Sequence, residues 1–336
     1  MMSEIPSKPK LDEYVKMGLV RSQTHPELPL TIYVYSELAS FERLWNNVTM
    51  ACRGLVVDDK GRCIVRCLTK FFNEDEPHAL CGMPQNQESV LYNKLDGSLI
   101  QIVNDKEYGL VITSKGSFTS DQAKWAKQIV DEKYTEADFK QGLTYAFELI
   151  HPENRIVLDY QGLRGLFLLA VIETDTGLEH DIDKYNFDKA EVVHDREKHL
   201  AGMVEGVVVK TGTHRVKVKT GEYIRLHRIV TEFTPKRVWE ALKDGDSLEF
   251  QNMPEEFQKW LDETIEDLQT KYNDIEIDAL KEVEDTKNLT DKEVGLSTNL
   301  KYKGIIFMVR NGKNLEQTIW KMVKPKKEVE HEITNA

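Results

Sequence analysis

The sequence predicts an α+β protein, with a domain of antiparallel sheets over residues 1–230 and a small all-helical domain over residues 231–336. Up to about residue 228, short runs of β-branched and aromatic residues alternate with Gly, Asn and Asp, which is typical of strands separated by turns. After residue 233, apolar residues recur at steps of three and four, the spacing of amphipathic helices. A strand-rich segment followed by a helical one indicates segregated α and β structure.

The expected strands are short and apolar, and they cover residues 30–35, 54–57, 99–103, 110–113, 143–147, 166–172 and 207–209. One helix interrupts them over residues 120–133, where Ala123, Ala126, Ile129 and Val130 recur near helical spacing behind a Ser or Asp cap.

Three helical pieces are expected after the domain boundary, which we place near residues 229–234. Thr234 and Pro235 form a helix start, as N-cap and first helical position, and the helix runs toward Gly245. A longer amphipathic helix begins at Pro254 and carries apolar residues from Phe257 to Ile275. A third piece covers residues 314–322.

The net charge of −12 is concentrated in one segment. Residues 244–285 hold 15 acidic residues and three lysines, whereas residues 208–228 carry six basic residues and Glu222 alone. The acidic segment fits a solvated helix face or a contact with another protein. A local basic strip is suited to phosphate, so the acidic total does not exclude an RNA or DNA partner.

The cysteines and the apolar runs of the sequence indicate the cellular compartment in which the protein is expected. Cys52, Cys63, Cys67 and Cys81 fall within thirty residues, but they lack the paired spacing of a zinc site, so reduced thiols are expected. No apolar run approaches the roughly 20 residues that span a bilayer, and the first residues lack the apolar stretch of a signal peptide. We therefore expect a cytoplasmic protein without membrane contact.

A candidate nucleophile lies in the run Tyr92-Asn93-Lys94-Leu95-Asp96-Gly97-Ser98, directly before an expected strand. A lysine amine attacks phosphorus only when it is neutral, which requires nearby cations or a metal to lower its pKa from about 10.4. Gly97 would allow close approach of the backbone to a nucleotide. Taken alone, the run also fits an ordinary surface turn.

Two carboxylates follow at strand ends. Glu148 ends the strand 143–147 and would accept from a ribose hydroxyl, while Phe147 could pack on a base. Glu205 precedes Gly206 and an apolar strand in which Val207 or Val208 could line an adenine. Because Mg²⁺ prefers carboxylates and keeps its waters, Glu205 is the candidate metal ligand. The alternative is a glutamate in a strand-end salt bridge.

Several cations complete the candidate site. Lys217 and Lys219 alternate on a strand, so both side chains share a face where a phosphate would offset their repulsion. Arg215 shares that parity, and a solvated basic edge strand is the alternative. Arg53, Lys70 and Lys115 suit the terminal phosphates of a triphosphate, and Phe71 and Phe72 offer a stacking surface.

The ordered set resembles the covalent nucleotidyltransferases, and most closely the type-1 RNA ligase family of tailed bacteriophages. The similarity covers roughly residues 50–228 and rests on Lys94-Leu-Asp-Gly-Ser98, Phe147-Glu148, Glu205-Gly206-Val-Val-Val-Lys210 and Lys217-Val-Lys219. More specific features are Arg53-Gly54, Lys70-Phe71-Phe72-Asn73, the stretch from Phe147 to Val157, and Leu99, where DNA ligases and capping enzymes usually carry arginine.

The resemblance implies an adenylation domain and an ATP-dependent RNA ligase. Lys94 would form lysyl-AMP, the AMP would pass to a 5′-phosphate RNA end, and a 3′-hydroxyl would then seal the bond. It would place Arg53, Lys70 and Lys115 near phosphates, and Lys217 and Lys219 at the α-phosphate. Glu148 would bind the ribose, and Glu205 would bind Mg²⁺ or Mn²⁺. Phe72, Gly206 and Tyr223 match positions that the family needs, and Tyr92 and Asn93 belong to the same nucleotide site.

The implied partner is RNA with 5′-phosphate and 3′-hydroxyl ends, including broken tRNA, repaired by a monomer during phage infection. The alternatives are a DNA-joining or capping enzyme, and a non-catalytic RNA-binding or phage-assembly protein on the same fold. The helices expected after residue 228 argue against DNA ligases, in which a β-rich OB barrel would follow.

Overall fold

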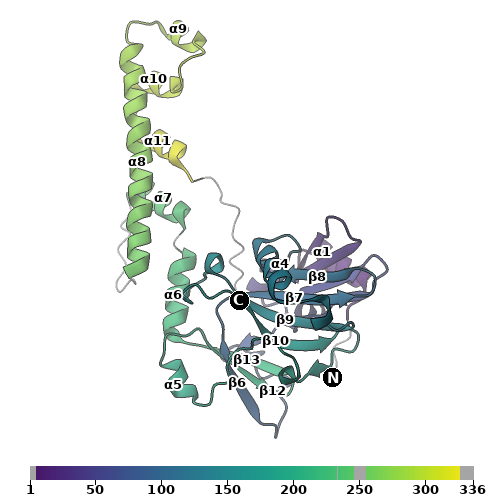
Figure 1. The fold of residues 1–336 in the computed structure, drawn as a ribbon. Coiled ribbons are helices and arrows are strands. Elements are labelled where there is room, and N and C mark those ends of the chain that lie inside the picture. The colour runs from purple at the N-terminus through teal and green to yellow at the C-terminus, as the bar shows by residue number, and fades with distance from the viewer. Residues whose placement is uncertain (1–4, 233, 246–254, 326–336) are drawn as a thin grey trace. The chain divides into compact units, whose positions relative to one another are not determined.

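The computed structural model describes residues 5–232, 234–245 and 255–325, and the chain divides into two compact units, 1–226 and 227–336 (Figure 1). The first unit is built on three sheets and the second on helices, so the α+β prediction is confirmed. No helix in the described ranges has the length and apolar character that a bilayer span requires.

The first sheet has four antiparallel strands in chain order: β1 (Val20–Thr24), β2 (Leu30–Tyr35), β3 (Arg53–Asp58) and β4 (Cys63–Val65). Three helices lie in the same part of the chain: α1 (Lys8–Lys16), α2 (Glu37–Phe41) and α3 (Asn47–Ala51). Two apolar clusters flank this sheet, one with Leu11 of α1 and one with Phe118.

The second sheet has five antiparallel strands in the order β11 (Glu179–His180), β10 (Gly165–Glu173), β9 (Leu143–Ile150), β7 (Ser98–Asp105) and β8 (Gly109–Ser114). Helix α4 (Asp121–Lys133) packs on it through Ala126, Ile129 and Val130, and its cap is the Ser120 hydroxyl, which accepts from Ala123 N (Figure 1). The helix expected over residues 120–133 and the four strands expected over residues 99–103, 110–113, 143–147 and 166–172 are confirmed here. Short 3₁₀ turns lie at Glu136–Asp138, Pro152–Asn154 and Ile182–Lys184.

The third sheet runs β5 (Phe72–Asn73), β13 (His214–Lys219), β12 (Gly206–Thr211) and β6 (Ser89–Lys94). Its β13–β12 and β12–β6 pairs are antiparallel, as expected, and the short β5–β13 pair at its edge is parallel. Helix α5 (Arg196–Leu200) precedes β12, and α6 (Gly221–Glu232) follows β13. Helix α6 was not predicted from the sequence, because its first residues continue the basic strip of residues 208–228 without a change of pattern.

The second unit contains α7 (Pro235–Asp244), α8 (Glu255–Asp285), α9 (Asp291–Leu296), α10 (Lys303–Arg310) and α11 (Glu316–Val323). Thr234 caps α7 and Gly245 ends it in the left-handed conformation, as predicted. Helix α8 continues ten residues past Ile275, and α9 and α10 were not predicted. The core joins Trp239 to Trp320, whose carbonyl accepts from the Trp239 indole at 2.7 Å.

Candidate active site

Lys94 ends β6 against a buried glutamate. The strand register pairs Gly206 with both Lys94 and Lys219, which brings the two lysines to the same end of the sheet. Lys94 Nζ lies 2.7 Å from Oε2 of Glu205, and Lys219 Nζ lies 3.1 Å from its Oε1. The Glu205 side chain is 1% exposed, and within the described residues its Oε1 accepts no hydrogen bond of good geometry.

Gly206 makes this convergence possible. Its φ is +153°, and a Cβ there would lie 1.9 Å from the carbonyl oxygen of Val218. Gly206 therefore allows the close approach of strands β12 and β13. Any larger residue would force β12 away from β13 and separate Glu205 from Lys219.

The pKa of Lys94 is raised, which corrects the expectation that neighbouring cations would lower it. Burial disfavours the ammonium, but the carboxylates of Glu205, Glu148 and Asp96 outweigh that effect. In this state Lys94 is a protonated partner of Glu205, and attack on phosphorus requires that pair to be broken.

Glu148 lies in the same group of charges. It is paired with Leu99 across β7 and β9, and its Oε1 accepts from the backbone N–H of Gly97 at 3.2 Å. Burial raises its pKa to about 7, although the charge of Lys94 works in the opposite direction. A Cβ at Gly97 would lie 2.3 Å from the carbonyl oxygen of Leu149, so this glycine accommodates strand β9, not the nucleotide as the sequence suggested.

Tyr223 stands behind the nucleophile loop, which corrects its assignment to the nucleotide. It is 3% exposed, and its hydroxyl donates to Oδ1 of Asp96 at 2.6 Å. The other oxygen of Asp96 accepts from the backbone N–H groups of Val157 and Leu158. Tyr223 therefore acts through Asp96, whose role in the Lys-x-Asp-Gly run the sequence analysis did not assign.

Phe71 holds two of the predicted phosphate ligands. Its ring centroid lies 4.9 Å from the guanidinium of Arg53 and 5.2 Å from Nζ of Lys217. Cation–π contacts of this kind stabilise a cation without neutralising it. The sequence suggested Phe71 as part of a stacking surface, whereas in the structure its ring packs against these two cations.

Lys70 and Lys115 make cation–π contacts with a second group of aromatic rings. Tyr35 lies 4.5 Å from Lys115 Nζ and 5.9 Å from Lys70 Nζ, and Trp45 lies 5.1 Å from Lys70 Nζ. Tyr35 and Trp45 come from the first sheet and the segment after α2, with no sequence signal that joins them to the site. Together, Arg53, Lys70, Lys115 and Lys217 form what we call the cation cluster.

The cation cluster is not neutralised by the protein. Among the described residues, none of its four side chains has a carboxylate within 4.0 Å, and Nη1 of Arg53 is buried without a hydrogen bond. Burial and then the charge of Lys70 hold the pKa of Lys217 well below its usual value. Burial is also the main cause of the lowered pKa of Lys70. Lys217 is buried and the other three cations are half-buried, and an anion between them would offset their mutual repulsion.

Arg215 does not belong to this group, although it shares strand parity with Lys217. Both of its terminal nitrogens lie 2.6 Å from Glu179, which also pairs with Lys210 at 3.2 Å. Its charge is therefore compensated by a structural ion pair.

Three predicted base contacts are corrected by strand parity. Phe147 is fully buried in the α4 face of the second sheet, with its ring 5.2 Å from that of Phe187. Phe72 is buried with Ala79 and Val216, and its ring faces Lys70 at 5.3 Å. Val207 pairs with Asn93 and Val218 on the face opposite Lys94. Val208, two residues from Gly206, shares the Lys94 face and replaces Val207 as the candidate.

Tyr92 and Asn93 point to opposite faces of β6. Tyr92 shares the face of Lys94 and pairs with Val208. Asn93 lies on the other face, where its Oδ1 is 3.1 Å from Nε2 of His199. Only Tyr92 is therefore on the side where the nucleotide site was expected.

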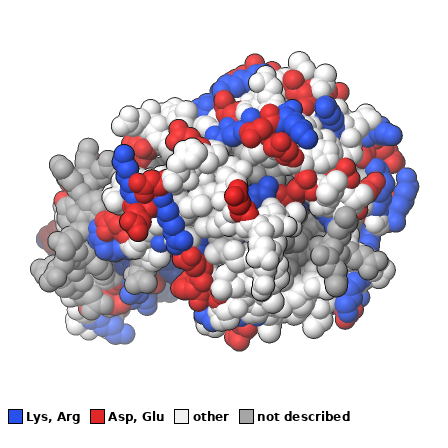
Figure 2. Space-filling view, turned by 90° about the horizontal axis from the view of Figure 1, so that it is seen from below, with Lys and Arg blue, Asp and Glu red and all other residues white. Residues whose placement is uncertain are grey.

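Among the described residues, we find no second candidate site in the cysteines or in the exposed charges. The four cysteines are free, as expected, and the described residues contain no group of three or more His, Cys, Asp or Glu side chains that could hold a metal. On the face drawn in Figure 2, basic and acidic side chains are interspersed and form no large patch of a single sign.

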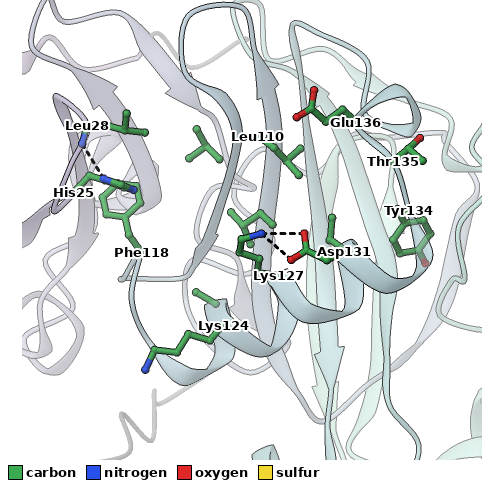
Figure 3. A pocket seen from close by; sticks show the side chains of 14 residues that line it. His25, Leu28, Leu110, Phe118, Lys124, Lys127, Asp131, Tyr134, Thr135 and Glu136 are labelled. Atoms are coloured by element: carbon green, nitrogen blue, oxygen red, sulfur yellow. Dashed lines mark hydrogen bonds and ion pairs between the residues drawn. The ribbon is translucent and has the colours of Figure 1, made fainter.

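A hollow of about 500 Å³ lies apart from these residues, between α4, β8 and the segment around His25 (Figure 3). Its walls include Leu28, Leu110 and Phe118, and its rim carries Lys127 paired with Asp131 at 2.8 Å. None of the predicted site residues lines it.

Comparison with known proteins gives one family match. A family profile described as RNA ligase matches residues 51–199. Two forms of an archaeal ATP-dependent RNA ligase are similar at 14% and 13% identity, covering 71% and 78% of this chain and 65% and 70% of theirs, each with a TM-score of 0.48. A mutant RNA ligase of Naegleria gruberi with ATP and Mn is 14% identical over 43% of this chain and 53% of its own, with a TM-score of 0.35. The chain thus spans about two thirds or less of the length of the first two structures it matches.

Proposed function

We propose that this chain, of which residues 51–199 match a family profile described as RNA ligase, is an ATP-dependent RNA ligase with Lys94 as its nucleophile. The observation that carries the proposal is the juxtaposition of Lys94, buried against Glu205, with a cluster of four cations that the described protein leaves without carboxylate partners. A polyphosphate supplies the missing anion, and the lysine is within the same group of charges.

In the first step, the neutral amine of Lys94 attacks the α-phosphorus of ATP. A P–N bond forms, the bond from the α-phosphorus to the bridging oxygen breaks, and pyrophosphate leaves with that electron pair. Arg53, Lys70 and Lys115 bind the leaving phosphates, and Lys217 and Lys219 stabilise the charge that develops at the α-phosphate. Glu148 accepts from the ribose. As ATP enters, its phosphates compete for Lys219, which loosens the ion pairs that keep Lys94 protonated. The ammonium proton of Lys94 then passes to solvent before the amine attacks, and a second N–H proton leaves as the P–N bond forms.

The next two steps use RNA. The 5′-phosphate of one end attacks lysyl-AMP and releases Lys94, which gives a 5′-5′ adenylylated strand. The 3′-hydroxyl of the other end then attacks the 5′-phosphorus, a phosphodiester forms, and AMP leaves. The residues that stabilise charge at the α-phosphate in the first step serve the same phosphorus in the second.

A divalent cation, Mg²⁺ or Mn²⁺, fits Glu205. This carboxylate is buried, and its Oε1 lacks a hydrogen bond among the described residues. Mg²⁺ takes oxygen ligands and keeps several of its waters, so one carboxylate together with substrate phosphates can hold it. When bound, the ion offsets negative charge on the triphosphate.

The wider assignment follows the same family. We assign nucleotide chemistry to residues 1–230 and leave residues 231–336 as a helical appendage. The substrate is RNA with 5′-phosphate and 3′-hydroxyl ends, and the role is repair of broken RNA, including tRNA, by a monomer in the cytoplasm of a phage-infected host.

Incubation with α-labelled ATP and Mg²⁺, followed by a denaturing gel, tests the proposal. Wild type is expected to carry the label and Lys94→Ala to carry none. Lys127→Ala, a change at an exposed lysine outside the site, is the matched control and should label normally. Unlabelled wild type would refute the ligase mechanism. Joining of 5′-phosphate RNA and of DNA by the labelled enzyme then separates RNA ligase from a DNA-joining relative.

A further inference from the structure

Gln101 is a buried amide between two sheets. It lies in the middle of β7, in register with Thr113 of β8 and Ala146 of β9, and is fully buried. Its Nε2 donates to the carbonyl oxygen of Gly54 in β3 at 3.0 Å and lies 3.3 Å from Oγ1 of Thr113. The side chain therefore links the five-stranded sheet to the first four-stranded one.

The hydrogen bond from Gln101 to Gly54 lies next to the backbone of two proposed phosphate ligands, Arg53 and Lys115. Gly54 follows Arg53 directly, with φ at +95°. A Cβ there would lie 2.0 Å from Gln101 Nε2 and 2.9 Å from the carbonyl oxygen of Lys115. The bend that carries Arg53 is thus packed between the Gln101 amide and the backbone of Lys115, although the two cations belong to different sheets.

The far end of the same interface has its own connection. There Arg62 bridges Asp58, the last residue of β3, and Asp105, the last residue of β7, with its closest contact to Asp105 at 2.6 Å. Near the cations, Gln101 makes the one side-chain hydrogen bond from β7 or β8 to β3 that the described residues contain. A change at Gln101 therefore alters the separation of Arg53 and Lys115 at the end where they bind anions.

We propose that Gln101 is a positioning residue that sets the separation of Arg53 and Lys115, and through it the affinity for the terminal phosphates of ATP. The inference rests on the proposed function for the identity of the nucleotide, but the polyphosphate site itself can be measured without catalysis. Within the described residues, Nε2 of Gln101 makes its hydrogen bond to Gly54, whereas Oε1 is buried without a hydrogen-bond partner. Because a buried amide N–H is costly to leave unpaired, the bond to Gly54 is expected to hold the bend in place.

Gln101→Met keeps the length of the side chain and removes the amide. Thr144→Val is the matched control, because Thr144 is equally buried in the same sheet and its hydroxyl bonds Thr174 and the backbone of Arg66, away from the cation cluster. Titration with inorganic tripolyphosphate, followed by calorimetry, is expected to give a Kd about tenfold weaker for Gln101→Met and unchanged for Thr144→Val.

Enzyme activity supplies the second readout. The ATP concentration for half-maximal labelling of Lys94 is expected to rise about tenfold in Gln101→Met, whereas sealing of pre-adenylylated RNA, which needs no triphosphate, stays at the wild-type rate. Gln101→Asn, too short to reach Gly54, serves where the Met variant does not fold.

The outcomes separate the two proposals. Equal tripolyphosphate affinity in wild type and both Gln101 variants would overturn the inference, and so would an equal loss of both reactions, which indicates a general packing role. If wild type binds tripolyphosphate and transfers no AMP, the ligase proposal fails and the titration alone decides the role of Gln101.

Discussion

The hydroxyl of Tyr223 donates a 2.6 Å hydrogen bond to Asp96, and both side chains are buried. Asp96 lies two residues after Lys94, and Tyr223 lies in the first turn of α6. Asp96 also accepts from the backbone of Val157 and Leu158, so one carboxylate joins the nucleophile loop to two distant segments. The ring of Tyr223 also lies 5.1 Å from Nζ of Lys219, so this tyrosine connects Asp96 to one of the two strand lysines.

Tyr223→Phe is expected to lower the free energy of unfolding by about 1–3 kcal/mol, because a buried carboxylate oxygen loses its donor. Tyr33→Phe is the matched control. Tyr33 is equally buried, but its partner Asp12 has a side chain that is 45% exposed, so water replaces the lost hydroxyl and the cost should be smaller. Urea unfolding of both variants measures the difference, and equal losses would contradict this account of Asp96.

Lys217→Met is expected to raise the melting temperature at pH 7 and to reduce AMP transfer to Lys94 about 100-fold or more. Burial, and then the charge of Lys70, lower the pKa of Lys217. At neutral pH the protonated side chain therefore lowers the free energy of unfolding. Because the unfolded chain binds this proton more tightly, wild-type stability rises with pH and the gain should shrink in alkaline buffer.

Lys219→Met provides the contrast for that experiment. Lys219 lies 3.1 Å from Glu205, so its loss leaves a buried carboxylate with one cation fewer and should lower the melting temperature. Thermal melts of the two variants at pH 7 and pH 9 test the pair. If both substitutions raised the melting temperature at pH 7, or both lowered it, the ion pair of Lys219 with Glu205 would not account for a difference between the two lysines.

Glu148→Gln is expected to become more stable, relative to wild type, as the pH rises. Burial raises the pKa of Glu148 from 4.5 to about 7. Its stabilising contribution is therefore complete below pH 4.5 and is lost as the pH rises through about 7, by at most roughly 3 kcal/mol. Glutamine stays neutral and avoids that loss.

Glu132→Gln is the control for the pH series. Glu132 is exposed, and its hydrogen bond to Arg164 lowers its pKa, so its replacement brings no gain in stability at higher pH. Melting temperatures at half-unit steps between pH 4.5 and 8 give both curves. A flat difference for Glu148→Gln would mean that its carboxyl ionises as freely in the folded protein as in the unfolded chain.

Helices and strands were predictable from the sequence where their pattern lies within a few neighbouring residues. Strand β2 and helix α7 have the expected residues, because a β-branched run and a Thr-Pro cap with a terminal glycine act within a few positions. Helix α6 and the parallel edge strand β5 were not predicted. Their conformations depend on what they pack against, which neighbouring residues do not reveal.

For the site, the sequence by itself determined the chemical types present and their order: a lysine in a Lys-x-Asp-Gly run, two strand-end glutamates, and alternating lysines. Only the tertiary structure decided which of them face one another. Strand parity turned Phe147 and Val207 away from the site, and packing between sheets brought Tyr35, Trp45, Phe71 and Gln101 to the cations. The tertiary structure also decided the protonation state of Lys94. The pKa of a buried lysine depends on its burial and on the charges that the fold brings near from distant parts of the chain.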